Sequence, residues 1–340
     1  MKMIETLKKL CLLDGISGDE GEVREYIISQ IKDYAQVTVD PLGNVIAFCK
    51  GKSAKNKVLV SAHIDEVGMI VTYINTDGTL MCDCVGGVDP AVVYAKRVTV
   101  GRKNVRGVIA STAVHNISKS ERGKAVGFDK LTVDIGCQSR EEAEKLVSLG
   151  DSIRFVSQFT EFGDGFVKCK AIDDRAGCAI MIQLIKDKPE YDTYFTFVVQ
   201  EEIGLRGAAC ASYTVAPDYA FVLEATTAAD IPSSSGSKRV CELGKGAVVS
   251  FMDRHTIYDK EMYDLAFELA RENDISCQTK TAVAGGNDAG AIHISRGGVR
   301  TTAVSLPCRY LHSPSCVINS RDMQSAYSLT KLLLDRTYNR

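Results

Sequence analysis

Two histidines and several carboxylates lie where predicted strands of this 340-residue chain end or where a helix begins. They are His63, Asp65, Asp173, Asp174, Glu201, Glu202, Glu224 and His312. Imidazole and carboxylate are the usual ligands of hydrolytic zinc, cobalt and manganese sites. One ion needs only about three protein ligands and water, so this set suits two ions that share a bridging carboxylate. In the pair Glu201-Glu202, one carboxylate can bind a cation while its neighbour takes a proton from the attacking water.

Each of these pieces has a structural explanation when it is taken alone. A His-x-Asp after a strand is more often a surface turn, and Asp-Asp-Arg before a helix is more often a capping signal. The hydrolase hypothesis therefore depends on all the pieces occurring together at strand ends. Competing motifs are absent: the chain has no H-E-x-x-H, no G-x-S-x-G and no G-x-x-x-x-G-K-[ST]. The glycine-rich GGNDAG at 285–290 lacks the spacing of a dinucleotide-binding loop.

Alternating strands and helices must position these residues. Continuous apolar strands, typical of a sheet covered on both faces, are predicted at 57–63, 194–200, 219–225 and 299–307. Helical patterns are predicted at 176–187, at 264–274 and from Ser320 onward. This alternation predicts the α/β class, with a three-layer α/β/α sheet that binds ligands at the carboxyl ends of its strands.

The middle of the chain has a different pattern. Short β-like runs broken by glycines fill residues 73–163, with one helix opened by Ser139 and Glu142. We expect a small β-rich module here, inserted into a catalytic α/β domain that comprises residues 1–72 and 164–340. Residues 96–130 hold nine Lys and Arg against two acidic residues, which is consistent with a solvated face, an interface or a substrate-steering patch.

Composition excludes several classes of protein. The formal net charge of −2 removes the electrostatic argument for nucleic-acid binding. No run of about 18 apolar residues predicts a membrane span, and the first residues do not resemble a signal peptide. The twelve cysteines form no C-x-x-C pair, so we expect free thiols in a reducing, cytoplasmic setting. Near the N-terminus, Ser17 and Glu20 have capping-box spacing, which predicts a helix capped by Ser17.

Six ordered segments resemble a known family of enzymes. SAHIDEVGMIV, KAIDDRAG, VVQEEIGLRGA, LEATTAADIP, GGNDAGAIH and RYLHS resemble the tetrahedral aminopeptidases and the glutamyl-aminopeptidase-like enzymes, and the likeness covers nearly the whole chain. The resemblance implies an aminopeptidase with two zinc or cobalt ions, manganese being a third option. It also implies that the inserted module forms dimers, and that six dimers build a hollow tetrahedral dodecamer into which peptides enter.

The resemblance also implies a role for each site residue. His63 and Glu224 would bind one metal, Glu202 and His312 the other, and Asp173 would bridge them. Glu201 would be the general base, and Asp65 would orient His63 through its second ring nitrogen. A cis peptide often follows the bridging residue, here at Asp174. Many relatives have aspartate where this chain has Glu224, a departure that can alter metal spacing or preference.

The sequence thus predicts a metal-dependent aminopeptidase that removes N-terminal residues from short peptides with water activated by Glu201. A related two-metal deacylase or carboxypeptidase remains an alternative, because it could use similar ligands. A non-enzymatic assembly protein is disfavoured, since a scaffold has no need for a base beside the ligand Glu202. A glycosidase is least favoured, because two-carboxylate sugar chemistry does not require this metal set. The preferred N-terminal residue is left open.

Overall fold

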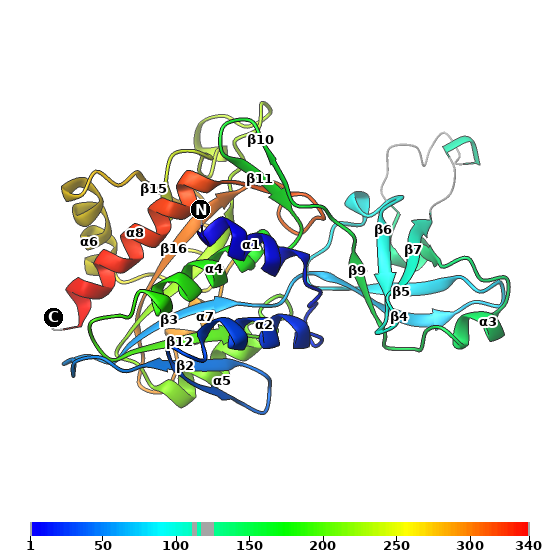
Figure 1. Ribbon diagram of the computed structural model, residues 1–340. Coiled ribbons are helices and arrows are strands. Elements are labelled where there is room, and N and C mark those ends of the chain that lie inside the picture. The colour runs from blue at the N-terminus through cyan, green and yellow to red at the C-terminus, as the bar shows by residue number, and fades with distance from the viewer. Residues whose placement is uncertain (1, 111–113, 117–125, 339–340) are drawn as a thin grey trace.

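An eight-stranded sheet forms the centre of the larger part of the molecule in the computed structural model, which describes residues 2–110, 114–116 and 126–338 (Figure 1). Its strands follow the order β1-β2-β12-β3-β13-β16-β14-β15. Their bounds are β1 (Gln36–Val39), β2 (Val45–Cys49), β3 (Val58–His63), β12 (Thr193–Val198), β13 (Tyr219–Thr227), β14 (Ala247–Val249), β15 (Cys277–Thr279) and β16 (Arg300–Cys308). The central strands β12, β3, β13 and β16 run parallel, so their carboxyl ends share one edge of the sheet.

Apolar side chains on both faces of the sheet explain why helices cover it twice. Along β13, Phe221 and Leu223 belong to one buried cluster, whereas Ala220 and Val222 belong to the cluster on the other face. The first face packs against α1 (Lys2–Leu12), α2 (Gly21–Ile31), α4 (Ile172–Lys186), α6 (Lys260–Glu272) and α8 (Ser320–Thr337). The second packs against α5 (Arg206–Val215) and α7 (Ala289–Ile292). The predicted three-layer α/β/α architecture is confirmed.

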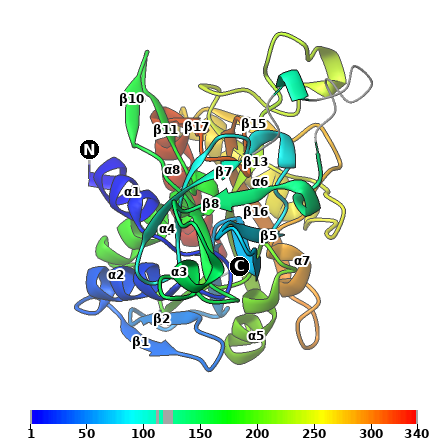
Figure 2. The same ribbon diagram turned by 90° about the vertical axis from the view of Figure 1, so that its right-hand side faces the viewer.

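A closed barrel lies beside this α/β part, in the order β4-β5-β8-β7-β6-β9 (Figures 1 and 2). Its strands are β4 (Gly68–Ile74), β5 (Leu80–Val85), β6 (Arg97–Val100), β7 (Val105–Ala110), β8 (Thr132–Asp134) and β9 (Ser152–Phe155). The predicted helix opened by Ser139 is α3 (Arg140–Glu144), and the Ser139 hydroxyl accepts a hydrogen bond from the Glu142 amide. The β-rich insertion is therefore confirmed as part of the fold, while its exact limits at residues 73 and 163 stay a prediction.

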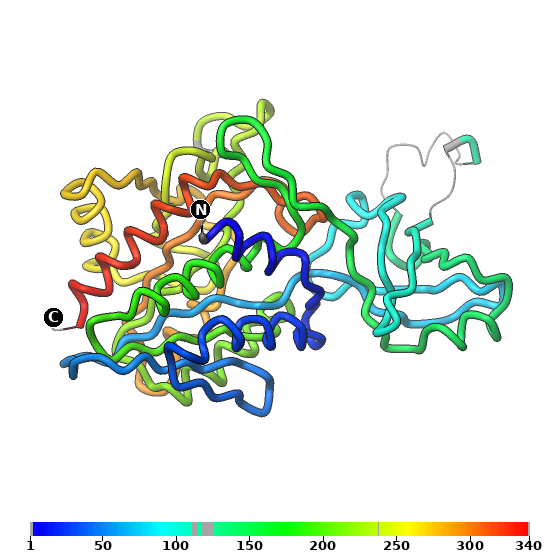
Figure 3. Tube along the Cα trace, viewed as in Figure 1, coloured from blue at the N-terminus to red at the C-terminus, as the bar shows by residue number. Residues whose placement is uncertain are grey.

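A small third sheet pairs the segment that follows the barrel with a strand near the end of the chain. It consists of β10 (Thr160–Phe162), β11 (Phe166–Cys169) and β17 (Cys316–Asn319), in that order. Short 3-10 helices lie at Pro90–Val92, Val114–Asn116, Phe128–Lys130 and Gly236–Lys238. The tube in Figure 3 follows the chain from β3 into the barrel and back through β9 to the α/β part. The chain thus enters the barrel from the carboxyl end of β3 and returns from β9 toward α4, which carries Asp173.

The predicted capping box near the N-terminus is wrong. Helix α2 begins at Gly21 without a side-chain cap, and the Glu20 carboxylate accepts a hydrogen bond from the Gly18 amide instead. The Ser17 hydroxyl donates a hydrogen bond to the carboxylate of Asp65, a residue 48 positions away. Because this tertiary contact uses the Ser17 side chain, the side chain does not cap the helix. All twelve cysteines are free thiols. None of the helices among the described residues is long and apolar enough to cross a membrane.

Candidate active site

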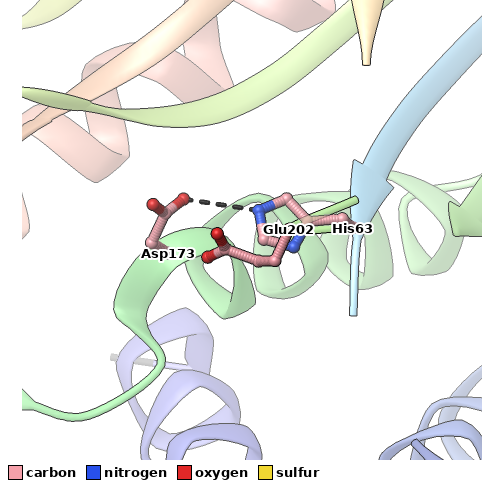
Figure 4. Close-up of side chains that lie close together, drawn as sticks. All are labelled: His63, Asp173 and Glu202. Carbon is pink, nitrogen blue, oxygen red and sulfur yellow. Dashed lines mark ion pairs between the residues drawn. The ribbon is translucent and has the colours of Figure 1, made fainter. Parts of the chain in front are cut away.

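The candidate site lies at the carboxyl edge of the four parallel strands. His63 is the last residue of β3, Glu224 lies near the end of β13, and Glu202 follows β12. His312 lies in the loop after β16, and Asp173 lies in the first turn of α4. Figure 4 shows His63, Asp173 and Glu202 pointing toward one another from three different elements. The sheet therefore brings together five side chains that are spread over 250 residues of sequence.

Asp173 occupies the centre of this group, and its two oxygens face different partners. Its Oδ1 lies 3.4 Å from Nε2 of His63, and its Oδ2 lies 3.7 Å from Nε2 of His312. Glu224 completes the first side, with Oε1 3.5 Å from Nε2 of His63. Glu202 completes the second, with Oε2 3.3 Å from Nε2 of His312. Asp173 thus lies between His63 with Glu224 on one side and His312 with Glu202 on the other. The donor atoms of His63, Asp173 and Glu202 also lie within 4.8 Å of one another, as do those of Asp173, Asp174 and Glu224.

The cluster concentrates negative charge in a buried place. Burial, reinforced by the charge of Asp173, raises the pKa of both Glu202 and Glu224 well above the usual value. Although burial lowers the pKa of His63, its contacts with Asp173, Asp65 and Glu224 raise that pKa well above the usual value overall. Oδ1 of Asp173 and Oε2 of Glu224 are buried without any hydrogen-bond partner. A buried acceptor without a hydrogen-bond partner lowers the stability of the folded protein, unless a donor or a cation binds it.

Asp65 ties the two neighbouring segments together. The nearest oxygen to Nδ1 of His63 is the Asp65 backbone carbonyl at 3.1 Å, with the carboxylate Oδ1 at 3.5 Å. The same carboxylate accepts hydrogen bonds from the amides of Glu201 and Glu202, at 3.0 and 3.2 Å, and from Ser17 at 2.6 Å. Burial raises the pKa of Asp65, but these partners and His63 lower it overall. Asp65 therefore contacts both the histidine and the Glu201-Glu202 turn.

Glu201 lies beside the cluster without making a contact within it. Its side chain lines a cavity of about 360 Å³, together with Asp173, Glu202, Glu224 and His312. Burial raises the pKa of Glu201 to about 8, and the carboxylates of Asp288, Asp173 and Asp65 add to the rise while His63 opposes it. A nearby cation would lower this pKa, because positive charge stabilises a carboxylate. Glu201 is thus a free carboxylate that faces the same space as the donor cluster.

Comparison with known proteins places this arrangement in a family. The M42 glutamyl aminopeptidase family matches residues 43–329. This chain belongs to that family. The lysyl aminopeptidase of Pyrococcus furiosus is 35% identical over 340 residues, which cover 97% of this chain and 96% of that protein. The expected resemblance is confirmed, and the chain is a peptidase.

Solved structures of M42 relatives also match the fold. The TET aminopeptidase from a marine sediment archaeon, Thaumarchaeota archaeon SCGC AB-539-E09, superimposes with a TM-score of 0.94 at 34% identity, covering 99% of this chain and 96% of its own. The TET1 peptidase of Pyrococcus horikoshii, also 34% identical, gives a TM-score of 0.88 over 98% and 99% of the two chains. That peptidase can assemble into a tetrahedron or a large octahedral shell. The M42 fold therefore covers both parts of this chain.

Two features of this M42 site are not evident in its sequence. The backbone carbonyl of Gly87, in the loop after β5 of the barrel, lies 2.8 Å from Nδ1 of His312. This contact orients the ring so that Nε2 faces Glu202 and Asp173. Asp288, in the GGNDAG segment, is fully buried with both carboxylate oxygens unpartnered, and burial raises its pKa to about 7. In the sequence this segment stands out by its glycines and by its likeness to the family, and neither signal predicts a buried acid.

Three residues at or beside the site have a left-handed backbone conformation. Ala171, Gln200 and His312 have φ angles of 54°, 57° and 55°, although none of them is glycine. This conformation is rarely adopted by other residues and costs of the order of 1–3 kcal/mol at each position. The three residues lie at or beside the turns that present Asp173, Glu201 and His312. The peptide bond between Asp173 and Asp174 is cis, as the resemblance implied.

Proposed function

We propose that this M42 peptidase is a two-metal aminopeptidase that removes N-terminal residues from short peptides. The observation that carries the proposal is the arrangement around Asp173, whose two oxygens face two separate His-plus-Glu pairs. A bridging carboxylate with two such pairs is the donor set expected for two adjacent cations. The family match supports the peptidase activity, and the geometry supports its dependence on metal.

The donor atoms fit divalent cations. Oδ1 of Asp173 and Oε2 of Glu224 are buried acceptors that have no hydrogen-bond partner among the described residues. Two imidazole nitrogens with three carboxylates suit zinc, cobalt or manganese. In the proposed assignment, His63 and Glu224 hold one ion, Glu202 and His312 hold the other, and Asp173 bridges them. Bound ions would polarise the scissile carbonyl and make water acidic enough to attack near neutral pH.

The residues of the chain handle the proton in this proposal. Glu201 accepts the proton of the attacking water and returns it to the amine that leaves. Asp65 keeps Glu201 in place through its hydrogen bond to the Glu201 amide and supports His63 from behind. The carboxylates around the cavity bind the free α-amine of the substrate, which limits cleavage to the first peptide bond. Glu224 takes the place of the aspartate of many relatives, and its Oε1 still reaches to 3.5 Å from His63.

Self-assembly is the second part of the proposal. The TET1 peptidase of Pyrococcus horikoshii forms closed shells, and this chain matches it over 98% of its length. We infer that residues 73–163 act as the dimerisation module and that dimers build a tetrahedral dodecamer in the cytoplasm. Sedimentation at micromolar protein concentration tests this inference. A 36.9 kDa monomer that cleaves peptides would contradict it.

A single comparison of substrates separates the proposed activity from the alternatives. We expect a panel of free-amine aminoacyl chromophores to be cleaved, chelation to abolish the activity, and zinc, cobalt or manganese to restore it. The matched N-acetylated chromophores should be inert, since they lack the amine. Cleavage of acetylated substrates at a similar rate would instead indicate a deacylase. Full activity after verified removal of metal would contradict the metal-dependent mechanism.

A further inference from the structure

The segment between α1 and α2, residues 13–20, contributes one buried hydroxyl to the surroundings of the candidate site. Ser17 is 8% exposed, and its Oγ donates a hydrogen bond of 2.6 Å to Oδ2 of Asp65, which is fully buried. The proposed function gives no role in metal binding or proton transfer to any residue of this segment. Ser17 is therefore linked to the site through the carboxylate of Asp65.

The two oxygens of Asp65 are shared among several donors. Oδ1 accepts the Glu201 amide at 3.0 Å, and Oδ2 accepts both the Glu202 amide at 3.2 Å and the Ser17 hydroxyl. A short hydrogen bond from a hydroxyl to a carboxylate is charge-assisted and about twice as strong as a neutral one. With Ser17 bound to Oδ2, the carboxylate keeps the orientation in which each oxygen faces one amide of the Glu201-Glu202 turn.

The turn that carries Glu201 and Glu202 needs support from outside. Gln200, the residue before it, has a φ angle of 57°, which is unfavourable for a residue other than glycine. Such a backbone conformation persists only where the surrounding structure holds it in place. The two amides that follow Gln200 donate to Asp65, so this carboxylate is one of the groups that hold the turn. A change in the orientation of Asp65 would therefore displace Glu201.

The backbone on each side of Ser17 is anchored to other parts of the fold. Ile16, which is 2% exposed, forms a parallel β-bridge with Glu66. The carboxylate of Asp19 accepts a hydrogen bond of 2.7 Å from Oγ of Ser152, in barrel strand β9. These contacts give the Ser17 hydroxyl a defined position from which it can orient a carboxylate.

We propose that Ser17 is a positioning residue of this peptidase, which orients Asp65 so that the Glu201-Glu202 turn keeps the geometry needed for catalysis. This inference rests on the proposed aminopeptidase function, in which Glu201 moves the proton. Without the hydroxyl, the Asp65 carboxylate gains freedom to rotate away from the two amides of the turn. Because Ser17 acts through Asp65, its loss should lower the turnover number and leave substrate binding nearly unchanged.

Amide hydrogen exchange tests the positioning without a measurement of activity. The wild type and its variants are compared as full chains with matched metal content, and the amides of Glu201 and Glu202 are followed. Ser17→Ala should exchange these two amides about tenfold faster, as expected when a charge-assisted hydrogen bond that supports them is lost. Ser17→Thr keeps the hydroxyl and should keep the slow exchange. Ser212→Ala is the matched control, since it removes a fully buried hydroxyl of α5 that donates to the Ala209 carbonyl.

Steady-state kinetics then shows whether the positioning serves the reaction. With the best free-amine chromophore and saturating metal, Ser17→Ala should lower kcat by about tenfold and leave KM within about twofold of wild type. Ser17→Thr and Ser212→Ala should have the kcat of the wild type.

Two results would overturn the proposal. Unchanged amide exchange in Ser17→Ala would show that Ser17 does not hold the turn, whatever the activity of the variant. Faster exchange with an unaltered kcat would show that the contact is only structural. A wild type that cleaves none of the chromophores would instead contradict the proposed function, and the exchange measurement would still decide whether Ser17 holds the turn.

Discussion

The barrel and the edge of the main sheet bury very different side chains. Among the described residues from 68 to 155, Ser152 and Arg154 are the buried polar ones, and the rest of that core is almost wholly aliphatic. The sheet edge buries carboxylates and imidazole within a few ångströms of one another. These buried residues are His63, Asp65, Asp173, Asp174 and Glu224, and Asp288 is buried as well. The barrel core is therefore satisfied by its own packing, whereas the sheet edge lacks partners for several of its charges.

This difference separates stability from chemistry. An apolar core gains free energy from burial regardless of what is bound. A buried cluster of like charges costs free energy until cations or substrate compensate it, which is the condition of a site built to bind. The two regions contact each other at several points, since Ser152 bonds to Asp19 and Arg154 pairs with Asp14. One of these contacts, between the Gly87 carbonyl and His312, reaches the candidate site itself. Substitutions on either side of this contact, and at it, can test the comparison.

The largest effect is expected from the base. Glu201→Gln keeps the shape of the side chain and removes its ability to accept a proton. We expect turnover of the best chromophore substrate to fall by about 10²–10⁴-fold with the metal content unchanged. Glu268→Gln, at an exposed position of α6, is the control and should be fully active. Near-normal turnover by Glu201→Gln would remove Glu201 from the mechanism.

A barrel substitution should affect stability without affecting the metals. Ile109 of β7 is 1% exposed, so Ile109→Ala leaves a cavity in the aliphatic core. We expect a loss of about 2–5 kcal/mol in the free energy of unfolding, measured by denaturant titration. The folded variant should bind the same number of metal ions as wild type, as measured by elemental analysis. Loss of metal from the folded variant would show that the two regions are not independent.

The loop between the regions should show an intermediate effect. A Cβ at Gly87 would lie 3.2 Å from Nδ1 of His312, so Gly87→Ala must shift the ring by a few tenths of an ångström. We expect about a tenfold loss of metal affinity or activity, in line with other changes behind metal-binding histidines. Gly297→Ala is the matched control, because nothing lies within 4 Å of its Cβ. Equal behaviour of the two variants would show that the site tolerates a shift of the His312 ring beside Gly87.

The smallest effect concerns the pH dependence of stability. Burial raises the pKa of Asp230, but its bidentate pair with Arg309 and the Leu243 amide lower it overall. A lowered pKa in the folded state stabilises the protein above the unfolded pKa, and this stabilisation is lost as the pH falls through the folded pKa. We expect Asp230→Asn to cost about 1 kcal/mol or less at pH 7, and less below pH 4. Unfolding titrations at the two pH values measure it, and an equal cost at both would contradict this explanation.

The sequence predicted the sheet well because its signals are local. Continuous apolar strands such as Val58–His63 and helices such as α8 have patterns that need no tertiary information. The polar residues at strand ends were also predictable, since parallel strands must bring their carboxyl ends together. The assignment of each residue to one metal came from the resemblance and stays a prediction.

Contacts between distant segments could not be predicted in the same way. Ser17 has the spacing of a helix cap, yet it bonds to Asp65 because the folded chain offers a buried carboxylate there. The Gly87 carbonyl reaches His312 across 225 positions, and no side chain marks it in the sequence. The burial of Asp288 and Lys280 likewise depends on how the loops after β15 fold over the cavity. Each of these is a property of tertiary packing rather than of local pattern.

The most direct test of the central claim is to locate the metals in crystals of the protein by anomalous scattering. We predict two metal peaks per subunit, one between His63 and Glu224 and the other between Glu202 and His312, with Asp173 touching both. Crystals of Asp173→Ala should lose at least one of the two peaks. A single peak in the wild type, peaks away from these residues, or two fully occupied peaks in Asp173→Ala would contradict the proposed bridge.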